Sequence, residues 1–424
     1  MYLLYSALLA AGMLLALPFW LWQMVRHGKY RTGWGERWGG VPERLARSEA
    51  PAIWVHAVSV GEVLAVSGLV AELRRRLPGF RVLVSTTTDT GQKLARERFG
   101  EENVFYFPLD FAFALRPYFR RLRPRLVVLA ETEFWPNFLR TAKGSGAPVA
   151  VVNARISDRS LTGYRRFHRL LRKALRNVDL FLGQTETDRE RLVAIGAPAE
   201  RVQVSGNLKF DLPEPEPPPV IAQLKAALRQ ADAHPVIVCG STMEGEEWLL
   251  LSTFAEVLAA HPKAVMVLAP RRPERFAEVG ELLQQTGVRF WRRSQWDGAL
   301  LSGGVFLLDS IGELAALYAL ADVAFVGGSL VPRGGHNILE PARYGVAVMT
   351  GPHTENFRDI VELFRTQDAV RITEAPQLGR DLMELVSDEA KRQQLGSRAA
   401  DLVRSQLGAT ERTVEALEKL LQTP

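Results

Sequence analysis

Short apolar runs alternate with stretches of helical periodicity along most of the chain. Regular alternation of this kind predicts an α/β protein with parallel, doubly wound sheets. Helices are expected between the strands, including 244–260 and 273–286, and a helical run from 389 to 422 closes the chain. Strands are expected at 52–58, 81–86, 104–107, 125–130, 148–153, 179–184 and 201–205, and then at 235–239, 264–269, 288–291, 305–308, 323–327 and 346–350.

An acidic, proline-rich stretch interrupts the alternation at 211–219 and predicts an extended linker. The 424 residues suit two domains with additions. We expect a Rossmann-like domain at 26–210 and a second one at 220–405, facing each other across a cleft, with helix 406–424 packing back on the first.

The first 25 residues contain no charged side chain. A segment of this length is long enough for a helix that crosses a bilayer. Basic residues follow at once, beginning with Arg26, and Trp20 and Trp22 suit a membrane interface. We therefore expect residues 1–25 to form a membrane-anchor helix, with the rest of the chain on the cytoplasmic side. Two alternatives stay open: the helix lies in the interface without spanning it, or it is buried in a soluble domain.

Charge is distributed unevenly. Residues 1–210 carry 32 Lys and Arg against 18 Asp and Glu, whereas the remainder is acidic overall. A basic first half favours a polyanionic partner, either nucleic acid or anionic lipid. The single cysteine, Cys239, excludes an internal disulfide and, without a CxxC motif, offers no structural zinc site.

Glu62 is the most informative acid in the first half. It lies where the expected strand 52–58 gives way to a helix, and no other acid occurs between Glu49 and Glu72. Ligands of α/β sheets bind at such joints. Ser59-x-x-Glu62 is also a capping box, so from this stretch alone Glu62 is either a helix cap or a catalytic group.

Three loops of small residues follow strands in the second half and open helices. Each offers free backbone N–H groups that suit a phosphate, and each has the spacing of a capping box. Together they predict a nucleotide pocket with a carboxylate free for ribose hydroxyls. The three pairs are Ser241-x-x-Glu244, Ser310-x-x-Glu313 and Asn337-x-x-Glu340.

Several nucleotide-binding classes are disfavoured. No GxxxxGK[ST] sequence, no GxGxxG after the first strand of either half and no DxD pattern is present. A transferase that uses no metal needs cations to balance the leaving group, and Lys209 and Arg271 follow expected strands. Of the two acids after strand 125–130, Glu131 and Glu133, we favour Glu131 as a site residue. His56 is expected in the core, and His336 is expected to order its loop.

Two basic segments interleave arginines with aromatic residues. Residues 155–176 contain eight Lys and Arg with one acid, and residues 116–125 contain five Arg. This composition suits a membrane surface or nucleic acid. The apolar N-terminus favours the membrane, although a solvated helix face remains an alternative.

Eight motifs along the chain resemble, in sequence and in order, those of the 3-deoxy-D-manno-octulosonic acid (Kdo) transferases of lipopolysaccharide assembly. The resemblance covers essentially the whole chain. The motifs include His56-Ala-Val-Ser-Val-Gly-Glu62, Glu131-Thr-Glu-Phe-Trp-Pro-Asn137, Gly206-Asn-Leu-Lys-Phe-Asp211 and Arg333-Gly-Gly-His-Asn337. The resemblance implies a two-domain GT-B fold, an inner-membrane anchor, CMP-Kdo as donor and a lipid A precursor as acceptor. It implies no cofactor and no metal.

The resemblance also implies roles for individual residues. Glu62 would be the general base that deprotonates the 6′-hydroxyl of the acceptor, and Glu131 and Lys209 would stabilise the transition state of an inverting transfer. Arg272 and Ile338 stand where histidine and proline are common in the family. The residues expected to contact CMP are Arg271, Arg272, Ile311, Gly312, Glu313, Asn337, Ile338, Leu339 and Glu340.

Rival functions remain at this stage. One is a GT-B enzyme that uses a uridine-linked sugar, either a transferase or an epimerase. Another is a membrane-tethered binder of anionic lipid without catalysis, and the bilayer-length N-terminus disfavours nucleic acid as the partner.

Overall fold

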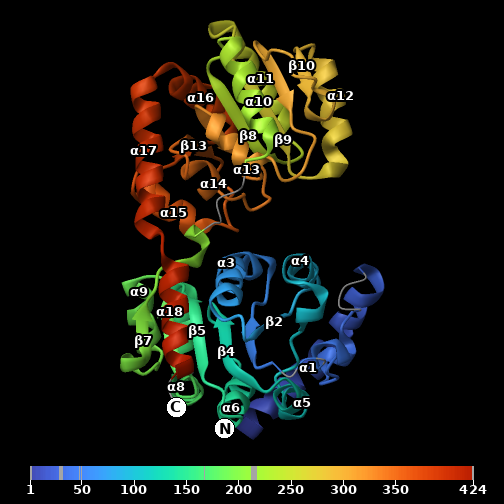
Figure 1. Cartoon of the computed structure of the whole chain (residues 1–424), viewed down its shortest axis with the longest axis vertical. Helices are drawn as coiled ribbons and strands as arrows, with labels where there is room; N and C mark the ends of the chain where they lie inside the picture. Colours follow the sequence, from blue (N-terminus) through green and yellow to red (C-terminus); the bar gives the residue numbers. More distant parts are fainter. Residues whose placement is uncertain are drawn as a thin grey trace. The chain divides into compact units, whose positions relative to one another are not determined.

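The computed structural model describes residues 2–27, 32–46, 48, 50–166, 168–211 and 217–422. It contains two compact units, each built on one parallel sheet (Figure 1). The first unit comprises Met1–Pro213 with Gln406–Pro424, and the second comprises Glu214–Ser405. The expected α/β class with two parallel sheets is confirmed. Of the expected linker 211–219, residues 212–216 lie outside the described residues.

The sheet of the first unit has the order β3-β2-β1-β4-β5-β6-β7. Its apolar runs are continuous because both faces of each central strand are buried. Trp54 of β1 faces one core, and its neighbours Ile53 and Val55 face the other. The strands are β1 (Ala52–His56), β2 (Arg81–Thr86), β3 (Val104–Tyr106), β4 (Pro124–Ala130), β5 (Val149–Ala154), β6 (Leu180–Gly183) and β7 (Val202–Val204).

Helices cover both faces of this sheet. Residues of α3, α4 and α18 pack with Ile53 and Val55, whereas residues of α5 and α6 pack with Trp54. The helices of the unit are α1 (Tyr2–His27), α2 (Trp34–Arg37), α3 (Val60–Arg76), α4 (Asp89–Phe99), α5 (Ala112–Leu122), α6 (Pro136–Gly144), α7 (Asp158–Arg166), α8 (His168–Leu175), α9 (Glu186–Ala194) and α18 (Ala409–Gln422).

The apolar N-terminal segment forms the helix α1, as expected. Its first turns dock on the first unit, since Ser6 Oγ accepts a hydrogen bond from Asn137 Nδ2 at 2.9 Å and Tyr2 accepts one from Asn177 Nδ2. Leucines on the helix remain exposed, for example Leu3 at 87% and Leu15 at 83%. Over the residues that the structure describes, we find no helix with the combined length and apolarity of a membrane span.

The sheet of the second unit has the order β10-β11-β9-β8-β12-β13-β14. The sequence pattern missed β14, which has only two residues. The strands are β8 (Val236–Thr242), β9 (Val265–Pro270), β10 (Phe290–Arg292), β11 (Gly304–Leu307), β12 (Val323–Val326), β13 (Ala347–Thr350) and β14 (Arg371–Ile372).

The helices of the second unit again lie on both sheet faces, with α11, α12 and α16 packed in one core and α10 and α13 in the other. They are α10 (Pro219–Gln230), α11 (Glu246–Ala260), α12 (Phe276–Thr286), α13 (Leu314–Leu317), α14 (Leu339–Ala342), α15 (Arg358–Thr366), α16 (Leu378–Ser387) and α17 (Glu389–Gln406).

The helical run expected at 389–422 is present and consists of two helices, α17 and α18. The chain breaks between α17 and α18, where Gly408 adopts a left-handed conformation with φ of 85°. Asp211 then caps α18, because its carboxylate accepts the backbone N–H of Gly408 at 2.8 Å and that of Thr410 at 2.5 Å. The terminal helix is thereby tied to the first unit.

Candidate active site

Glu62 occupies the third position of α3, directly after β1. The Ser59 side chain caps the helix by accepting the Glu62 N–H, and its hydroxyl donates to Glu62 Oε1 at 3.1 Å. Glu62 Oε2 accepts the Val58 N–H at 2.8 Å. The capping interaction expected from the sequence is therefore present, and it holds the carboxylate in one orientation.

The environment of Glu62 changes its acidity. The residue is only 8% exposed, and burial raises the pKa of its carboxyl to about 7. The nearby charges of Glu131 and Glu133 contribute to this rise in pKa, whereas the hydrogen bonds from Val58 and Ser59 oppose it. A group with such a pKa can accept a proton and return it near neutral pH.

Glu131 and Glu133 follow β4 in a turn. Glu131 has a positive φ of 56°, and its N–H donates to Val152 O at 2.9 Å, so the backbone leaves the strand at this residue. Its Oε1 lies 3.3 Å from Lys209 Nζ. Burial raises the pKa of Glu133, and the charge of Glu131 adds to this effect. The structure thus brings together Glu62, Glu131 and Lys209, three residues singled out from the sequence.

Lys209 lies in a short 3₁₀ turn, Leu208–Phe210, and two asparagines hold that turn. Asn207 Oδ1 accepts the Lys209 N–H at 3.0 Å. Asn153, at the end of β5, accepts the Leu208 N–H on its Oδ1 at 3.0 Å and is fully buried. Sequence reasoning missed Asn153, because it appeared as the last residue of an apolar strand.

His56 does not belong to this group. Its ring is fully buried and stacks on Phe107 with centroids 3.8 Å apart. Nδ1 contacts Ser85 O at 3.1 Å, and burial lowers the pKa of the ring to about 3. His56 is therefore a neutral core histidine, as expected, although its Nε2 has no hydrogen-bond partner among the described residues.

In the second unit, the charge of Arg271 acts on both His336 and Glu340. Arg271 follows β9, its side chain is exposed, and its N–H donates to Thr242 O at 2.9 Å. Burial, together with the charge of Arg271, lowers the pKa of His336 to about 4. Burial raises the pKa of Glu340, whereas Asn337 and Arg271 oppose this rise. A cation and a carboxyl group thus lie at the strand ends of one sheet.

The three expected capping boxes have different outcomes. Asn337 does not cap α14, whose N-cap is Ile338, but its Oδ1 accepts the N–H of Leu339, the first residue of the helix, at 3.1 Å. Glu313 instead precedes α13, and Arg293 binds its carboxylate with contacts of 2.9 and 2.8 Å. The carboxylate of Glu313 is therefore not free, because an arginine 20 residues away in the sequence pairs with it. Next to it, Ile311 is 67% exposed and Gly312 has a φ of 89°.

The box Ser241-x-x-Glu244 is wrong, since α11 begins two residues later and Glu244 is exposed. The structural role belongs to Glu246, which is fully buried. Its Oε2 accepts the N–H groups of Met243 and Gly328, and its Oε1 accepts those of Ser329 and Leu330, all at 2.7 to 2.9 Å. Glu246 therefore holds the loop after β12 against the start of α11.

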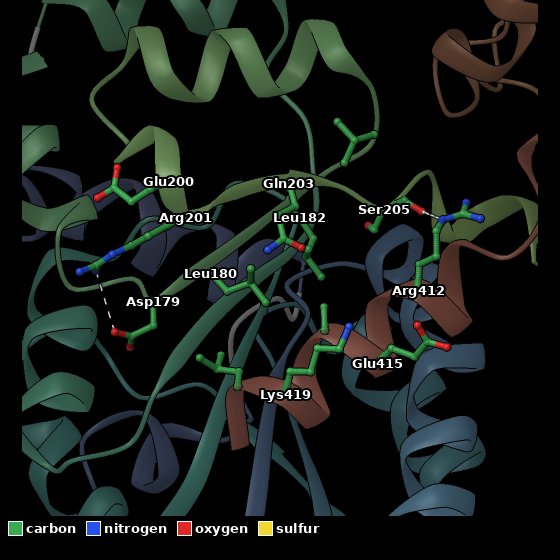
Figure 2. Close-up of a pocket in the computed structure, with 13 residues that line it drawn as sticks. Asp179, Leu180, Leu182, Glu200, Arg201, Gln203, Ser205, Arg412, Glu415 and Lys419 are labelled. Atoms are coloured by element: carbon green, nitrogen blue, oxygen red, sulfur yellow. Dashed lines mark hydrogen bonds and ion pairs between the residues drawn. The ribbon is translucent and has the colours of Figure 1, made fainter. Parts of the chain in front are cut away.

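The other residues that were expected to contact CMP differ in their exposure. Arg272 is exposed, and Ile338 and Leu339 are buried. Within the described ranges, no group of three His, Cys, Asp or Glu residues has the arrangement of a metal site. A cavity of about 450 Å³ lies between β6, β7 and α18, and none of the expected site residues lines it (Figure 2).

Comparison with known proteins identifies the family. Residues 32–212 match the family model described as 3-deoxy-D-manno-octulosonic-acid transferase (kdotransferase). The chain is 33% identical over 423 residues to the 3-deoxy-D-manno-octulosonic acid transferase of Haemophilus influenzae, covering 99% of this chain and 98% of the relative. It is 36% identical over 417 residues to that of Bordetella pertussis, covering 95% of each.

Solved structures add a likeness of fold. A putative UDP-N-acetylglucosamine 2-epimerase from Listeria monocytogenes superposes with a TM-score of 0.56 over 88% of this chain and 97% of its own, at 13% identity. An identity this low supports the fold alone. The full-length relatives above 30% identity establish more: this chain belongs to the 3-deoxy-D-manno-octulosonic acid transferases and is a glycosyltransferase.

Proposed function

We propose that the protein transfers Kdo from CMP-Kdo to the 6′-hydroxyl of a lipid A precursor, with inversion at the anomeric carbon. The observation that carries the proposal is Glu62, a buried carboxyl with a pKa of about 7 beside the Glu131–Lys209 pair. The Bordetella and Haemophilus relatives are named for the same sugar.

In the proposed step, Glu62 takes the proton of the acceptor hydroxyl. The hydroxyl oxygen forms a bond to the anomeric carbon while the bond from that carbon to the CMP phosphate oxygen breaks. CMP leaves with the electron pair, and a single displacement inverts the anomeric centre. Lys209, held by Glu131 at 3.3 Å, is the cation of this group and offsets the negative charge that develops.

The second unit is the proposed binder of the nucleotide. Arg271 supplies a positive charge, and the exposed residues Ile311 and Gly312 and the Asn337 side chain supply polar groups. Among the acids of the three loops, Glu340 is the proposed partner of the ribose hydroxyls, because Glu244 is exposed outside a cap and Arg293 pairs with Glu313. Glu313 remains a proposed contact of CMP. Arg272 offers a side-chain cation, and Ile338 and Leu339 offer backbone contacts.

We place the protein at the inner membrane, on the cytoplasmic side. The exposed leucines of α1 and the basic first half support this placement. Exposed Arg172 and Lys173 of α8 are suited to the phosphates of the lipid acceptor.

Activity should depend on pH through Glu62. A general base must be deprotonated, so we expect kcat/KM to rise with pH through an apparent pKa of about 7. Initial rates of CMP release across pH, at low donor concentration, measure this dependence. A limb near the ordinary value of 4.5 would mean that the base is a solvated carboxylate and not Glu62.

A product assay tests the proposed function. Detergent-purified protein receives a tetraacylated lipid A precursor and CMP-Kdo generated in situ, with a chelator present in the transfer step. We expect the lipid to gain the mass of one or more Kdo units, and protection by CMP but not by UDP. An unchanged lipid mass with CMP still bound would rule out this acceptor, and protection by UDP alone would favour a uridine-linked donor.

A further inference from the structure

A cationic groove lies between α5 and α6, on the first unit. It has a volume of about 680 Å³, and four arginines line it together with Phe119 and Thr141. The arginines are Arg116, Arg120, Arg123 and Arg140. No acidic residue contributes to its lining.

The arginines have few partners of their own. Arg116, Arg120 and Arg123 are exposed, and among the residues that the structure describes no carboxylate pairs with them. Arg140 is half-buried, and its charge acts on Asp110. Three unpaired guanidinium groups around one cavity are a site for a phosphate, since arginine binds phosphate oxygens in bidentate fashion.

The cavity between β6, β7 and α18 differs, because its arginines have partners in the lining. There, Arg201 contacts Asp179 and Arg412 donates to Ser205 O at 2.9 Å, so these two arginines have partners within the cavity (Figure 2). In the α5–α6 groove, the carbonyls at the end of α6 are also satisfied without arginine. Ser145 N–H donates to Thr141 O and Ala142 O, both at 3.0 Å. The carbonyls of Thr141 and Ala142 therefore do not need an arginine as a hydrogen-bond donor.

The neighbourhood of the groove indicates the source of the phosphate. Arg140 Cζ lies 4.4 Å from the centroid of the Tyr2 ring, so α1 borders α6 (Figure 1). On the same first turns, Leu3, Leu4 and Leu8 are exposed by 65 to 87%. Apolar side chains on a helix that borders the wall of a cationic groove match the junction between acyl chains and headgroup phosphates.

We propose that this groove binds the phosphate of an anionic membrane lipid, separately from the acceptor. The inference rests on the proposed function only for the presence of a membrane. It adds a lipid partner that orients α1 and α5 on the bilayer, while the reacting groups stay at the carboxyl ends of β1 and β4.

Vesicle flotation tests the proposal. We compare phosphatidylcholine vesicles with and without phosphatidylglycerol, at low ionic strength. The double variant Arg116→Gln/Arg120→Gln should bind the anionic vesicles about thirtyfold more weakly, since each basic residue near an anionic surface contributes about fivefold. The matched control is Lys225→Gln/Arg229→Gln, an exposed pair with the same spacing on α10. An equal loss in the control pair would overturn the proposal.

A charge-preserving variant separates a groove from a charged face. A Cβ at Gly144 meets no atom within 4 Å, so Gly144→Phe can fill the cavity without a clash at the backbone. We expect its preference for phosphatidylglycerol to fall towards that of the double variant. An unchanged preference in Gly144→Phe would overturn the groove as a site.

Two further readouts complete the experiment. Thermal unfolding verifies that each variant folds. All variants should transfer Kdo to a detergent-dispersed acceptor at the wild-type rate. If the wild type itself is inactive, the proposed function is wrong. Vesicle binding tests the groove independently of this activity.

Discussion

Replacing Glu62 with glutamine should lower kcat by roughly 10²–10⁴-fold, the usual contribution of a general base. Glutamine has nearly the same shape and keeps one acceptor oxygen for the N–H of Val58 or the hydroxyl of Ser59. It cannot take a proton from the acceptor. The loss should therefore fall on kcat, with the KM for the donor nearly unchanged, and CMP release under steady-state conditions measures both.

Stability provides the second readout for this variant. Because the folded-state pKa of Glu62 is raised from 4.5 to about 7, its contribution to stability is complete below pH 4.5 and is lost as pH rises through 7. Glutamine removes this dependence, so the variant should be at least as stable as the wild type above pH 7. Thermal unfolding at several pH values checks the sign.

The control for this substitution lies on the same helix. Glu72→Gln removes a half-buried carboxylate that pairs with the exposed Arg75, and it should change neither kcat nor stability appreciably. If Glu62→Gln turns over as fast as Glu72→Gln, Glu62 is a helix cap and the reaction uses another base.

The central strands were predictable because they are buried on both faces. In a parallel sheet such strands are continuous apolar runs, and β1, β4 and β5 all stand out in this way. Periodicity did not identify Gly408 as the residue at which α17 and α18 separate, because helices tolerate an isolated glycine and the apolar pattern continues past it. Its cause is non-local, since Asp211 caps the new helix.

The candidate site likewise combines features that local sequence predicts with features that depend on distant parts of the chain. Local spacing identified Ser59 and Glu62 as a cap, but burial, which shifts the pKa of Glu62, depends on the whole fold. Asn153 holds the Lys209 turn through a hydrogen bond to a residue 55 positions away. Arg293 likewise occupies Glu313 from a different segment. Sequence spacing reports neighbours along a helix and says nothing about such partners.

Glu246 illustrates how a local rule can select the wrong acid. Ser241-x-x-Glu244 satisfies the capping-box spacing, yet Gly245 precedes the helix and the neighbouring Glu246 makes the buried contacts. Four backbone N–H groups from two segments converge on its carboxylate. The largest stability effect should therefore arise at Glu246.

Glu246→Ala should lower the free energy of unfolding by at least about 3 kcal/mol, because it leaves four buried N–H groups without an acceptor. Urea unfolding of the full chain measures the change. Glu244→Ala is the matched control, since this exposed neighbour should change stability by no more than about 0.5 kcal/mol.

Glu246→Gln separates the hydrogen bonds from the volume of the side chain. Its amide keeps the size of glutamate, but its NH₂ group faces N–H donors in place of one acceptor oxygen. We expect an intermediate loss of stability, because Ser329 and Leu330 can keep their acceptor while Met243 and Gly328 lose theirs, or the reverse. If glutamine and alanine both behave like Glu244→Ala, water replaces the carboxylate and Glu246 does not hold the loop. If glutamine is as stable as glutamate, volume and not hydrogen bonding explains the alanine result.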